Sequence, residues 1–452
     1  MRPPEGRLRS MTRLFGTDGV RGVANRELTP DLALALGRAA GFVLGPGGGE
    51  VVVGRDTRVS GPMLEAALVA GLCSSGVHSL LAGVMPTPAV AFLTLDAKAR
   101  AGAVISASHN PVGDNGIKFF SDEGVKISGE LEETIESAMA SEPPGLPTGT
   151  DVGTATPFDG ALDAYIDHLL SAIEAPLSGL KIVLDCAHGA AWQAGPRAFR
   201  EAGADVVGLH TEPDGARINV ECGSTSPEEL GRRVVAEGAD VGLAFDGDAD
   251  RVLAVDERGH MVDGDRIIAM AAFRMHAAGE LKNDIVVATV MANLGFHRAL
   301  KDRGIEVFAA PVGDKYVAEA MKERGAMLGG EQSGHIIFAA HSTTGDGILT
   351  GLKVAEMVHD SDQPLSLSSS VFDTYPQELV NVPVRRKEAL NSAEGLWSTV
   401  RAAEASLGDR GRVLVRASGT EPLVRVMVEA EDADTASTTA AALADAVREE
   451  LG

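Results

Sequence analysis

Short apolar runs alternate along this chain with polar, glycine-rich loops and with longer segments of helical spacing, a pattern typical of α/β proteins. The first complete unit has an apolar strand over 50–53 that leads into a charged loop. A helix is expected over 62–75, with Ser60 as its cap, and a second strand is expected over 78–82.

This order of strand, loop, helix and strand recurs twice. The expected elements are strands at 180–185 and 284–288, helices at 196–201 and 295–302, and returning strands at 204–209 and 305–309. Units of about 30 to 35 residues have the usual length of βαβ modules. The repetition predicts three similar domains.

Each module is followed by another apolar strand that ends in an unusually polar loop. These strands, at 103–105, 240–245 and 326–328, lead into SASHNP (106–111), DGDADR (246–251) and GGEQSGH (329–335). Sheets in α/β proteins place their binding sites beyond the carboxyl ends of strands. Three such loops in register therefore indicate functional positions.

The C-terminal part has a different order and predicts a smaller α+β domain. Its expected elements are strands at 379–384, 412–415 and 424–428, a helix around Trp397 and a closing helix at 435–450. The expected fold class is α/β: three similar mixed α/β domains plus the smaller C-terminal domain. A linker rich in Pro, Gly and Thr at 141–157 and the module spacing predict domains at 11–157, 158–256, 257–370 and 371–452.

Composition narrows the class of partner. The net charge of −24 argues against nucleic acid or an anionic membrane surface. Cys73, Cys186 and Cys222 lack C-x-x-C spacing, which favours reduced core thiols in a cytoplasmic protein. No apolar stretch is long enough for a bilayer, and residues 1–10 have no apolar core of a secretory signal.

Asp246, Asp248 and Asp250 alternate along the second polar loop, so their side chains lie on one side of an extended segment. Crowded carboxylates repel one another unless a cation holds them, and an all-oxygen ligand set favours Mg²⁺. A calcium loop is one alternative, because D-G-D-A-D resembles the start of an EF-hand, although no flanking helix pair is evident. A solvated turn is the other.

Ser108 stands just past the end of a strand, beside His109 and a short loop away from Lys118. A hydroxyl held on a rigid strand end and faced by cations is suited to carrying a phosphoryl group. The alternative is a polar turn in which these side chains satisfy backbone groups. Ser106 competes for the same role, since it lies on the same side of the strand.

Two further loops suggest ligand contacts. Segment 416–420 (RASGT) offers a guanidinium, two hydroxyls and backbone amides, with Arg425 on the returning strand, which suits a phosphate group. Its alternative is a tight hairpin with surface arginines. Glu331, Ser333 and His335 supply the acceptors and donors that sugar hydroxyls require, or else a polar loop cap.

Taken in order, SASHNP, DGDADR, GEQSGH and RASGTEP closely resemble the α-D-phosphohexomutase superfamily, and the resemblance extends from Met11 to the C-terminus. It implies four domains around a central cleft, with a phosphorylated Ser108. One Mg²⁺ per subunit would be bound by that serine and by Asp246, Asp248 and Asp250. The other implied roles are catalysis by Arg21 and Lys118, sugar binding by Glu331, Ser333 and His335, and phosphate binding by Arg416, Ser418, Gly419, Thr420 and Arg425.

Within the superfamily, GTDGVRG (16–22), MPTPAV (85–90), DNGIKFF (114–120) and TTGDG (343–347) resemble the bacterial members that act on amino sugars. The implied reaction is the reversible conversion of glucosamine 6-phosphate to glucosamine 1-phosphate, which feeds cell-wall precursor synthesis. Glucosamine 1,6-bisphosphate would be both intermediate and activator. A homodimer is an assembly to test.

Several alternatives stay open at this point. Phosphomannomutase or phosphoglucomutase activity would use the same four loops. A phosphatase is disfavoured because nothing in the sequence positions water. A sugar-phosphate sensor is disfavoured because it needs neither the serine nor the aspartates. Three residues depart from the family pattern, namely His188, Arg217 and Lys315.

Overall fold

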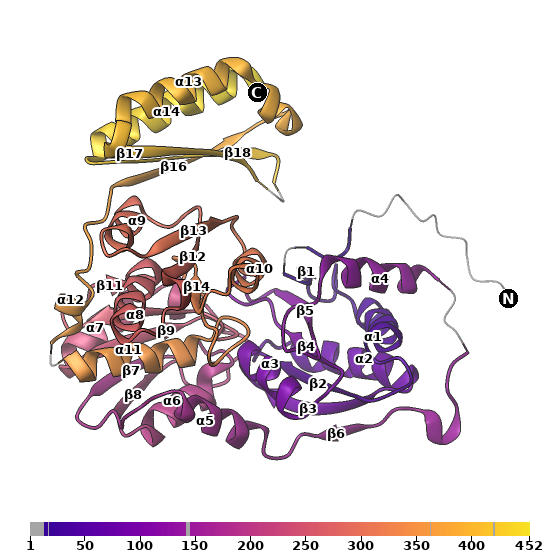
Figure 1. Ribbon diagram of the computed structural model, residues 1–452. Coiled ribbons are helices and arrows are strands. Elements are labelled where there is room, and N and C mark those ends of the chain that lie inside the picture. Colours follow the sequence, from indigo (N-terminus) through magenta and orange to yellow (C-terminus); the bar gives the residue numbers. More distant parts are fainter. Residues whose placement is uncertain (1–12, 17, 142–144, 362, 419–420) are drawn as a thin grey trace. The chain divides into compact units, whose positions relative to one another are not determined.

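The computed structural model of the protein describes residues 13–16, 18–141, 145–361, 363–418 and 421–452 (Figure 1). The chain divides into two compact units. One contains the chain up to Met291 together with Glu306–Ser369, and the other contains Ala292–Ile305 and Ser370–Gly452. The first unit has three sheets and the second has one. The expected α/β class, with a smaller C-terminal sheet domain, is confirmed.

The first sheet has six strands in the order β1-β5-β4-β2-β3-β6. Strands β2, β3, β4 and β6 are mutually parallel, whereas β5 is antiparallel to both β4 and β1. The strands are β1 Val20–Val23, β2 Glu50–Arg55, β3 His78–Val84, β4 Ala101–Ile105, β5 Asp114–Ser121 and β6 Ala155–Pro157. The helices are α1 Pro30–Leu44, α2 Gly61–Ser74, α3 Thr87–Asp96 and α4 Gly129–Ala140.

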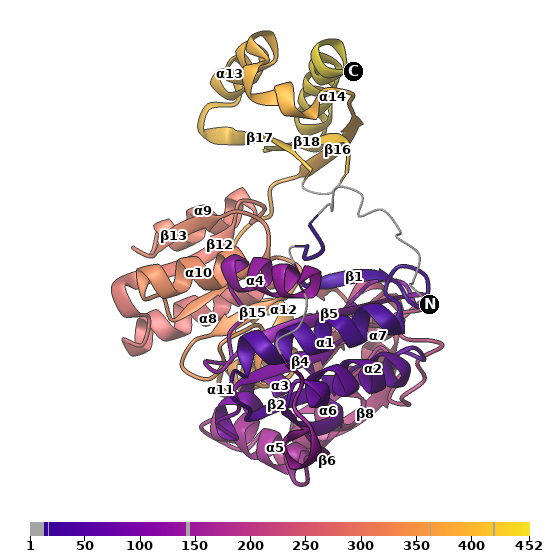
Figure 2. The same ribbon diagram turned by 90° about the vertical axis from the view of Figure 1, so that its right-hand side faces the viewer.

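Helices α1 and α2 lie side by side (Figure 2) and cross closely because both have glycine at the contact. A methyl group on Gly37 would lie 2.2 Å from the carbonyl oxygen of Leu68, and one on Gly71 would lie 2.3 Å from that of Leu34. Ser60 does not cap α2 as predicted. Its hydroxyl instead accepts a hydrogen bond of 2.9 Å from Nδ2 of Asn115 on β5.

The second sheet has the order β11-β10-β9-β7-β8 and the third has the order β13-β12-β14-β15. Strands of the second sheet are β7 Lys181–Asp185, β8 Asp205–Leu209, β9 Val241–Phe245, β10 Val252–Asp256 and β11 Met261–Val262. Strands of the third are β12 Ile285–Thr289, β13 Glu306–Ala310, β14 Leu328–Gly330 and β15 Ile336–Phe338. The helices of this part are α5 Ala161–Ser171, α6 Ala191–Glu201, α7 Glu228–Glu237, α8 Gly264–Ala278, α10 Asp314–Arg324, α11 Gly347–Ser361 and α12 Leu365–Ser368.

Helices α3 and α11 were not predicted from the sequence, and their burial gives the reason. Residues Thr87 to Leu93 of α3 are nearly all buried, and so are residues Gly347 to Leu352 of α11. Helix α11 contacts β9, β10, α6, α8 and β15. A helix covered all round has no polar face, so its sequence lacks the amphipathic period that identifies surface helices.

The second unit is an antiparallel sheet in the order β16-β18-β17. Its elements are β16 Gln377–Pro383, β17 Gly411–Ala417, β18 Leu423–Ala430, α13 Glu394–Leu407 and α14 Ala433–Leu451, joined by α9 Leu294–Lys301. Helices α13 and α14 cover the same face of the sheet (Figures 1 and 2). Val424, Val426 and Val428 of β18 belong to the core that these helices close.

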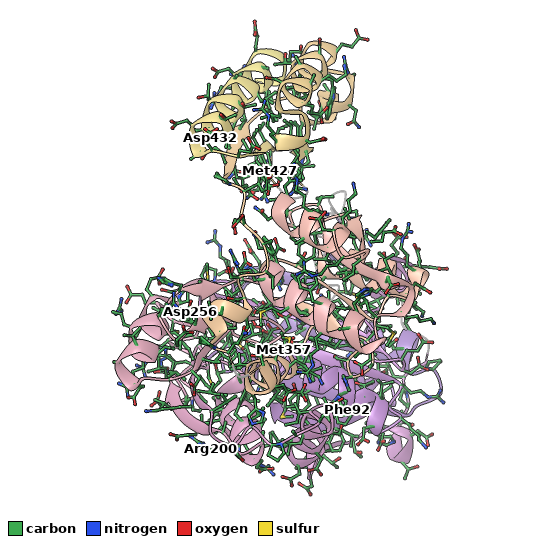
Figure 3. All side chains as sticks on the ribbon, turned by 60° about the vertical axis from the view of Figure 1, so that its left-hand side comes forward. Phe92, Arg200, Asp256, Met357, Met427 and Asp432 are labelled. Atoms are coloured by element: carbon green, nitrogen blue, oxygen red, sulfur yellow. The ribbon has the colours of Figure 1, made fainter. Side chains whose placement is uncertain are left out.

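Helix α9 joins the second unit through the other face of β18. Successive strand residues point to opposite faces, so Met427 and Glu429 face away from α13 and α14 (Figure 3 labels Met427). Glu429 is fully buried and accepts a hydrogen bond of 3.0 Å from the backbone N–H of Leu294, the first residue of α9. Arg412 on β17 donates a hydrogen bond of 2.5 Å to the same carboxylate. This ion pair gives the buried glutamate its partner.

Candidate active site

The Ser108 loop follows β4 and is held by a buried arginine. Ser108 is 1% exposed and has a left-handed backbone, with φ of 50°. Arg58 is fully buried, and its guanidinium donates to Asp56 and to carbonyl oxygens of this loop. Those carbonyls belong to Ser108 at 2.9 Å, Asn110 at 2.8 Å, Pro111 at 2.6 Å and Asp114 at 2.9 Å. One side chain therefore fixes the path of the whole loop.

The two serines of the loop have different partners. The Ser108 hydroxyl donates a hydrogen bond of 2.5 Å to Oδ2 of Asp246. The Ser106 hydroxyl donates to Oδ2 of Asp56 at 2.6 Å and accepts from the backbone N–H of Ser108 at 2.9 Å. Ser106 is thus bound within the framework of the loop, whereas Ser108 faces the acidic cluster.

Asp246, Asp248 and Asp250 follow β9, are all buried, and place carboxylate oxygens within 4.8 Å of one another. Burial and the two neighbouring aspartates raise the pKa of Asp246 well above its usual value. Oδ1 of Asp248 and Oδ1 of Asp250 are buried without a hydrogen-bond partner among the described residues. Buried carboxylate oxygens that accept no hydrogen bond, in an all-oxygen cluster, fit a divalent cation such as Mg²⁺.

The two cations expected near the transferred group are both close by. Lys118 on β5 is buried, and its Nζ lies 2.8 Å from Oδ2 of Asp248 and 3.9 Å from Oδ2 of Asp250. Burial alone would lower the pKa of Lys118, but Asp18 and the acidic cluster raise it far above its usual value. Arg21 on β1 donates to Oδ1 of Asn110 at 3.2 Å and pairs with Asp18.

The third loop joins β14 to β15 and also reaches the acidic cluster. Glu331 accepts a hydrogen bond of 3.0 Å from the N–H of Gly313, and the Ser333 hydroxyl lies 3.4 Å from the same carboxylate. His335 is 1% exposed. Its Nε2 accepts from the N–H of Gly345 at 3.0 Å, and its Nδ1 lies 3.5 Å from Oδ2 of Asp250. Both ring nitrogens therefore face protein groups.

Three cations of this region were not among the expected site residues. Arg58 was missed because its partners are backbone carbonyls, which leave no sequence pattern. Arg251 follows the aspartates directly, with Nη1 3.3 Å from Nδ1 of His109 and Nε 3.8 Å from Oδ1 of Asp250. Lys126 pairs with both Asp18, in the turn before β1, and Asp314, the first residue of α10. The adjacency of Arg251 to the acidic motif was the one available signal.

In the second unit, Arg416 on β17 stands directly opposite Arg425 on β18. Like charges in cross-strand register are unfavourable unless an anion lies between them. Burial and Arg425 lower the pKa of Arg416, and Nε of Arg425 is buried without a partner among the described residues. Ser418 follows β17, and its carbonyl oxygen accepts a hydrogen bond of 2.9 Å from Nζ of Lys387. Lys387 was not among the residues that the sequence suggested for this site. Gly419 and Thr420 lie outside the described residues.

The departures from the family pattern lie in three different surroundings. Arg217 forms a surface ion pair with Asp214, in which Nε lies 2.7 Å from Oδ2. Nζ of Lys315 lies 3.5 Å from Oε2 of Glu132. His188 is buried beside the Asp246 loop, and its carbonyl accepts a hydrogen bond of 2.6 Å from Thr57.

Comparison with known proteins gives a match along nearly the whole chain. Four family models match, described as phosphoglucomutase/phosphomannomutase alpha/beta/alpha domain I over residues 12–144, domain II over 163–259, domain III over 263–375, and C-terminal domain over 379–446. Phosphoglucosamine mutase of Heliobacterium modesticaldum is 50% identical and is matched over 97% of this chain and 100% of its own. The Rhodococcus opacus enzyme of the same name is 53% identical over 97% of this chain and 99% of its own.

Solved structures are similar as well. A phosphoglucomutase/phosphomannomutase family protein from Burkholderia thailandensis has a TM-score of 0.82 at 26% identity, covering 97% of both chains. Aspergillus fumigatus N-acetylphosphoglucosamine mutase, solved with GlcNAc-6P and magnesium, has a TM-score of 0.69 at 18% identity, covering 97% of this chain and 96% of its own. Among the helices described here, none has the length and apolar character needed to cross a bilayer.

Proposed function

The chain belongs to the phosphoglucomutase/phosphomannomutase family, and we propose that it interconverts glucosamine 6-phosphate and glucosamine 1-phosphate. One observation carries the chemistry: the Ser108 hydroxyl lies 2.5 Å from Asp246, within a buried cluster of three aspartates and beside buried cations. The amino-sugar substrate is supported by relatives at about half identity that are named phosphoglucosamine mutase.

Ser108, once phosphorylated, would donate its phosphoryl group to the free hydroxyl of the sugar phosphate. The bond between phosphorus and the serine oxygen breaks as the bond to the sugar oxygen forms, the sugar hydroxyl loses its proton and the serine oxygen takes one up, which gives a 1,6-bisphosphate. That intermediate then reorients within the site and returns its other phosphoryl group to Ser108. Lys118 and Arg251 neutralise charge on the transferred group, and Arg21 supports them through Asn110.

The aspartates, with phosphorylated Ser108, are the residues that would bind one Mg²⁺ per subunit. When bound, this ion would offset the negative charge of the cluster and of the phosphoryl group. The Oδ1 atoms of Asp248 and Asp250, which accept no hydrogen bond from the described residues, support this assignment.

We assign the remaining loops to the sugar and to the phosphate that does not react. Glu331 and Ser333 would contact sugar hydroxyls. Because both ring nitrogens of His335 face protein groups, its proposed role is to position Asp250 rather than to contact the sugar. The distal phosphate would be bound by the C-terminal loop, through Arg416, Ser418, Gly419, Thr420 and Arg425. Activation by glucosamine 1,6-bisphosphate, a homodimer and a cytoplasmic location remain predictions.

Phosphomannomutase or phosphoglucomutase activity is the alternative, since the Burkholderia structure carries that family description. The test is kcat/KM for glucosamine 6-phosphate, glucose 6-phosphate and mannose 6-phosphate in one coupled assay. We expect the amino sugar to be preferred at least about tenfold, or about 1.4 kcal/mol. Equal or reversed preference would refute the substrate assignment and leave the mutase chemistry standing.

A further inference from the structure

A second group of side chains of the types that bind metals lies at the carboxyl ends of β7 and β8, in the same sheet as β9, which precedes the Asp246 loop. Asp185 ends β7, His210 directly follows β8, and Cys222 lies in the loop before α7. Strands β7 and β8 are adjacent and parallel, so their carboxyl ends bring Asp185 and His210 together. One ligand atom of each of the three residues lies within 4.8 Å of the others.

We propose that Asp185, His210 and Cys222 form a zinc site that is separate from the magnesium site. One carboxylate oxygen, one imidazole nitrogen and one thiolate make a mixed ligand set that suits Zn²⁺ and not Mg²⁺. Water would supply the fourth ligand. The ring of His188 lies beside that of His210, with the ring centroids 5.0 Å apart.

The surrounding contacts orient two of these ligands. The Asp185 carboxylate is fully buried and accepts hydrogen bonds of 2.9 Å from the N–H groups of Ala187 and Gly223. Nδ1 of His210 lies 3.0 Å from this carboxylate, and Nε2 lies 3.7 Å from Oε2 of Glu229. An imidazole with one nitrogen toward the metal and the other toward a carboxylate is the arrangement seen around protein-bound zinc.

Zinc binding would change the protonation of the site. Burial and the neighbouring Asp185 raise the pKa of Cys222 to about 12, so its thiol is protonated while no metal is bound. Coordination would release this proton, and the proton on Nδ1 of His210, to solvent. Without a metal, the same contacts amount to an ion pair between His210 and Asp185.

The position of the site connects it to the Ser108 loop. The segment before Cys222 carries Asn219, whose Nδ2 donates a hydrogen bond of 2.8 Å to the carbonyl of Ser108. Gly223 packs so closely that a methyl group there would lie 2.4 Å from the carbonyl oxygen of Phe245, the last residue of β9. Zinc would therefore stiffen the segment that supports both polar loops.

The test uses cobalt as a probe of thiolate coordination. Full-length protein is stripped with a chelator, saturated with millimolar Mg²⁺ to occupy the aspartate cluster, and titrated with Co²⁺ and then Zn²⁺. The variants are Cys222→Ser and His210→Asn, with Cys73→Ser as the matched control in the same chain. Circular dichroism reports folding, and melting temperature is measured with and without Zn²⁺.

We expect a thiolate-to-cobalt absorption band in the parent and in Cys73→Ser, displaced by about one equivalent of Zn²⁺. Zn²⁺ should raise the melting temperature of both by several degrees, because it binds only the folded state. Each ligand variant should lose the band and the shift, so failure of one variant to fold leaves the other as the test. A parent without the band, or a band that persists in folded Cys222→Ser, would overturn the proposal.

Discussion

Nη2 of Arg58 donates a hydrogen bond of 2.9 Å to the carbonyl oxygen of Ser108, and the arginine is fully buried. Ser108 has a left-handed backbone, which non-glycine residues seldom adopt without support. The arginine supplies that support from 50 positions earlier in the sequence. The placement of the proposed nucleophile thus depends on a side chain that need not touch the substrate.

Arg58→Lys should reduce kcat while changing KM little. Lysine keeps the charge beside Asp56 but cannot donate to four carbonyls at once, so the Ser108 hydroxyl loses its position. Misplacement by about 1 Å costs about 100-fold in rate. Arg55→Lys is the control, because Arg55 pairs with Glu65 at 3.0 Å instead. A folded Arg58→Lys enzyme with the kcat of the parent would show that the loop holds its shape without the arginine.

Ser108→Ala should lose at least about 1000-fold in kcat with modest change in substrate binding. Peptide mass spectrometry should find the phosphoryl group on Ser108 in the parent. Ser106→Ala should retain that phosphate and lose stability instead, by about 1–3 kcal/mol, because buried Asp56 loses a donor. Phosphate on Ser106, or normal turnover by Ser108→Ala, would refute the mechanism.

Arg416→Ala and Arg425→Ala should each raise KM in both reaction directions. A charge-assisted contact to phosphate contributes about 1.5–3 kcal/mol, which corresponds to about 10- to 150-fold in KM. Arg401→Ala, an exposed arginine on α13 of the same unit, should leave KM unchanged. If both folded variants keep the KM of the parent, the distal phosphate is bound elsewhere.

Asp346→Asn should change how stability depends on pH. Burial raises the pKa of Asp346 to about 6, against about 3.9 in an unfolded chain. As pH rises from about 4 to about 6, the unfolded chain has released a proton that the folded chain retains, so Asp346 lowers folded stability by about 3 kcal/mol. The asparagine variant lacks this loss.

Urea unfolding across this pH range measures the effect as the difference between parent and variant. The Tyr165 hydroxyl donates a hydrogen bond of 2.8 Å to Asp346, and an asparagine amide would keep an acceptor for it. The N–H of Leu349 donates to the other carboxylate oxygen at 2.9 Å, so asparagine keeps an acceptor for only one of the two donors. That lost hydrogen bond lowers the stability of the variant by a similar amount at each pH, and the slope with pH reports the charge. Parallel pH profiles for the two proteins would mean that Asp346 ionises normally in the folded state.

The sequence alone determined the alternation of strands and helices, the three repeated modules and the position of each polar loop after a strand. It also pointed to Ser108, to the three aspartates and to Lys118. Hydroxyl, carboxylate and ammonium groups close to a strand end indicate a binding or catalytic site whatever the rest of the fold. These are local properties, and burial imposes a period of two or 3.6 on neighbouring positions. Helices that are buried along most of their length, such as α3, were not predicted for the same reason, since they have no continuous polar face.

The tertiary structure alone decided which of these residues meet. The hydroxyl of Ser108 reaches Asp246 across 138 positions, whereas Ser106, two residues away, is bound to Asp56. Packing also places His335 beside Asp250 and brings the guanidinium of Arg58 to the backbone carbonyls of the Ser108 loop. It places the first turn of α9 against the C-terminal sheet, where Leu294 donates to Glu429. Contacts between distant segments depend on how whole layers pack, and a buried polar group takes whichever partner that packing supplies.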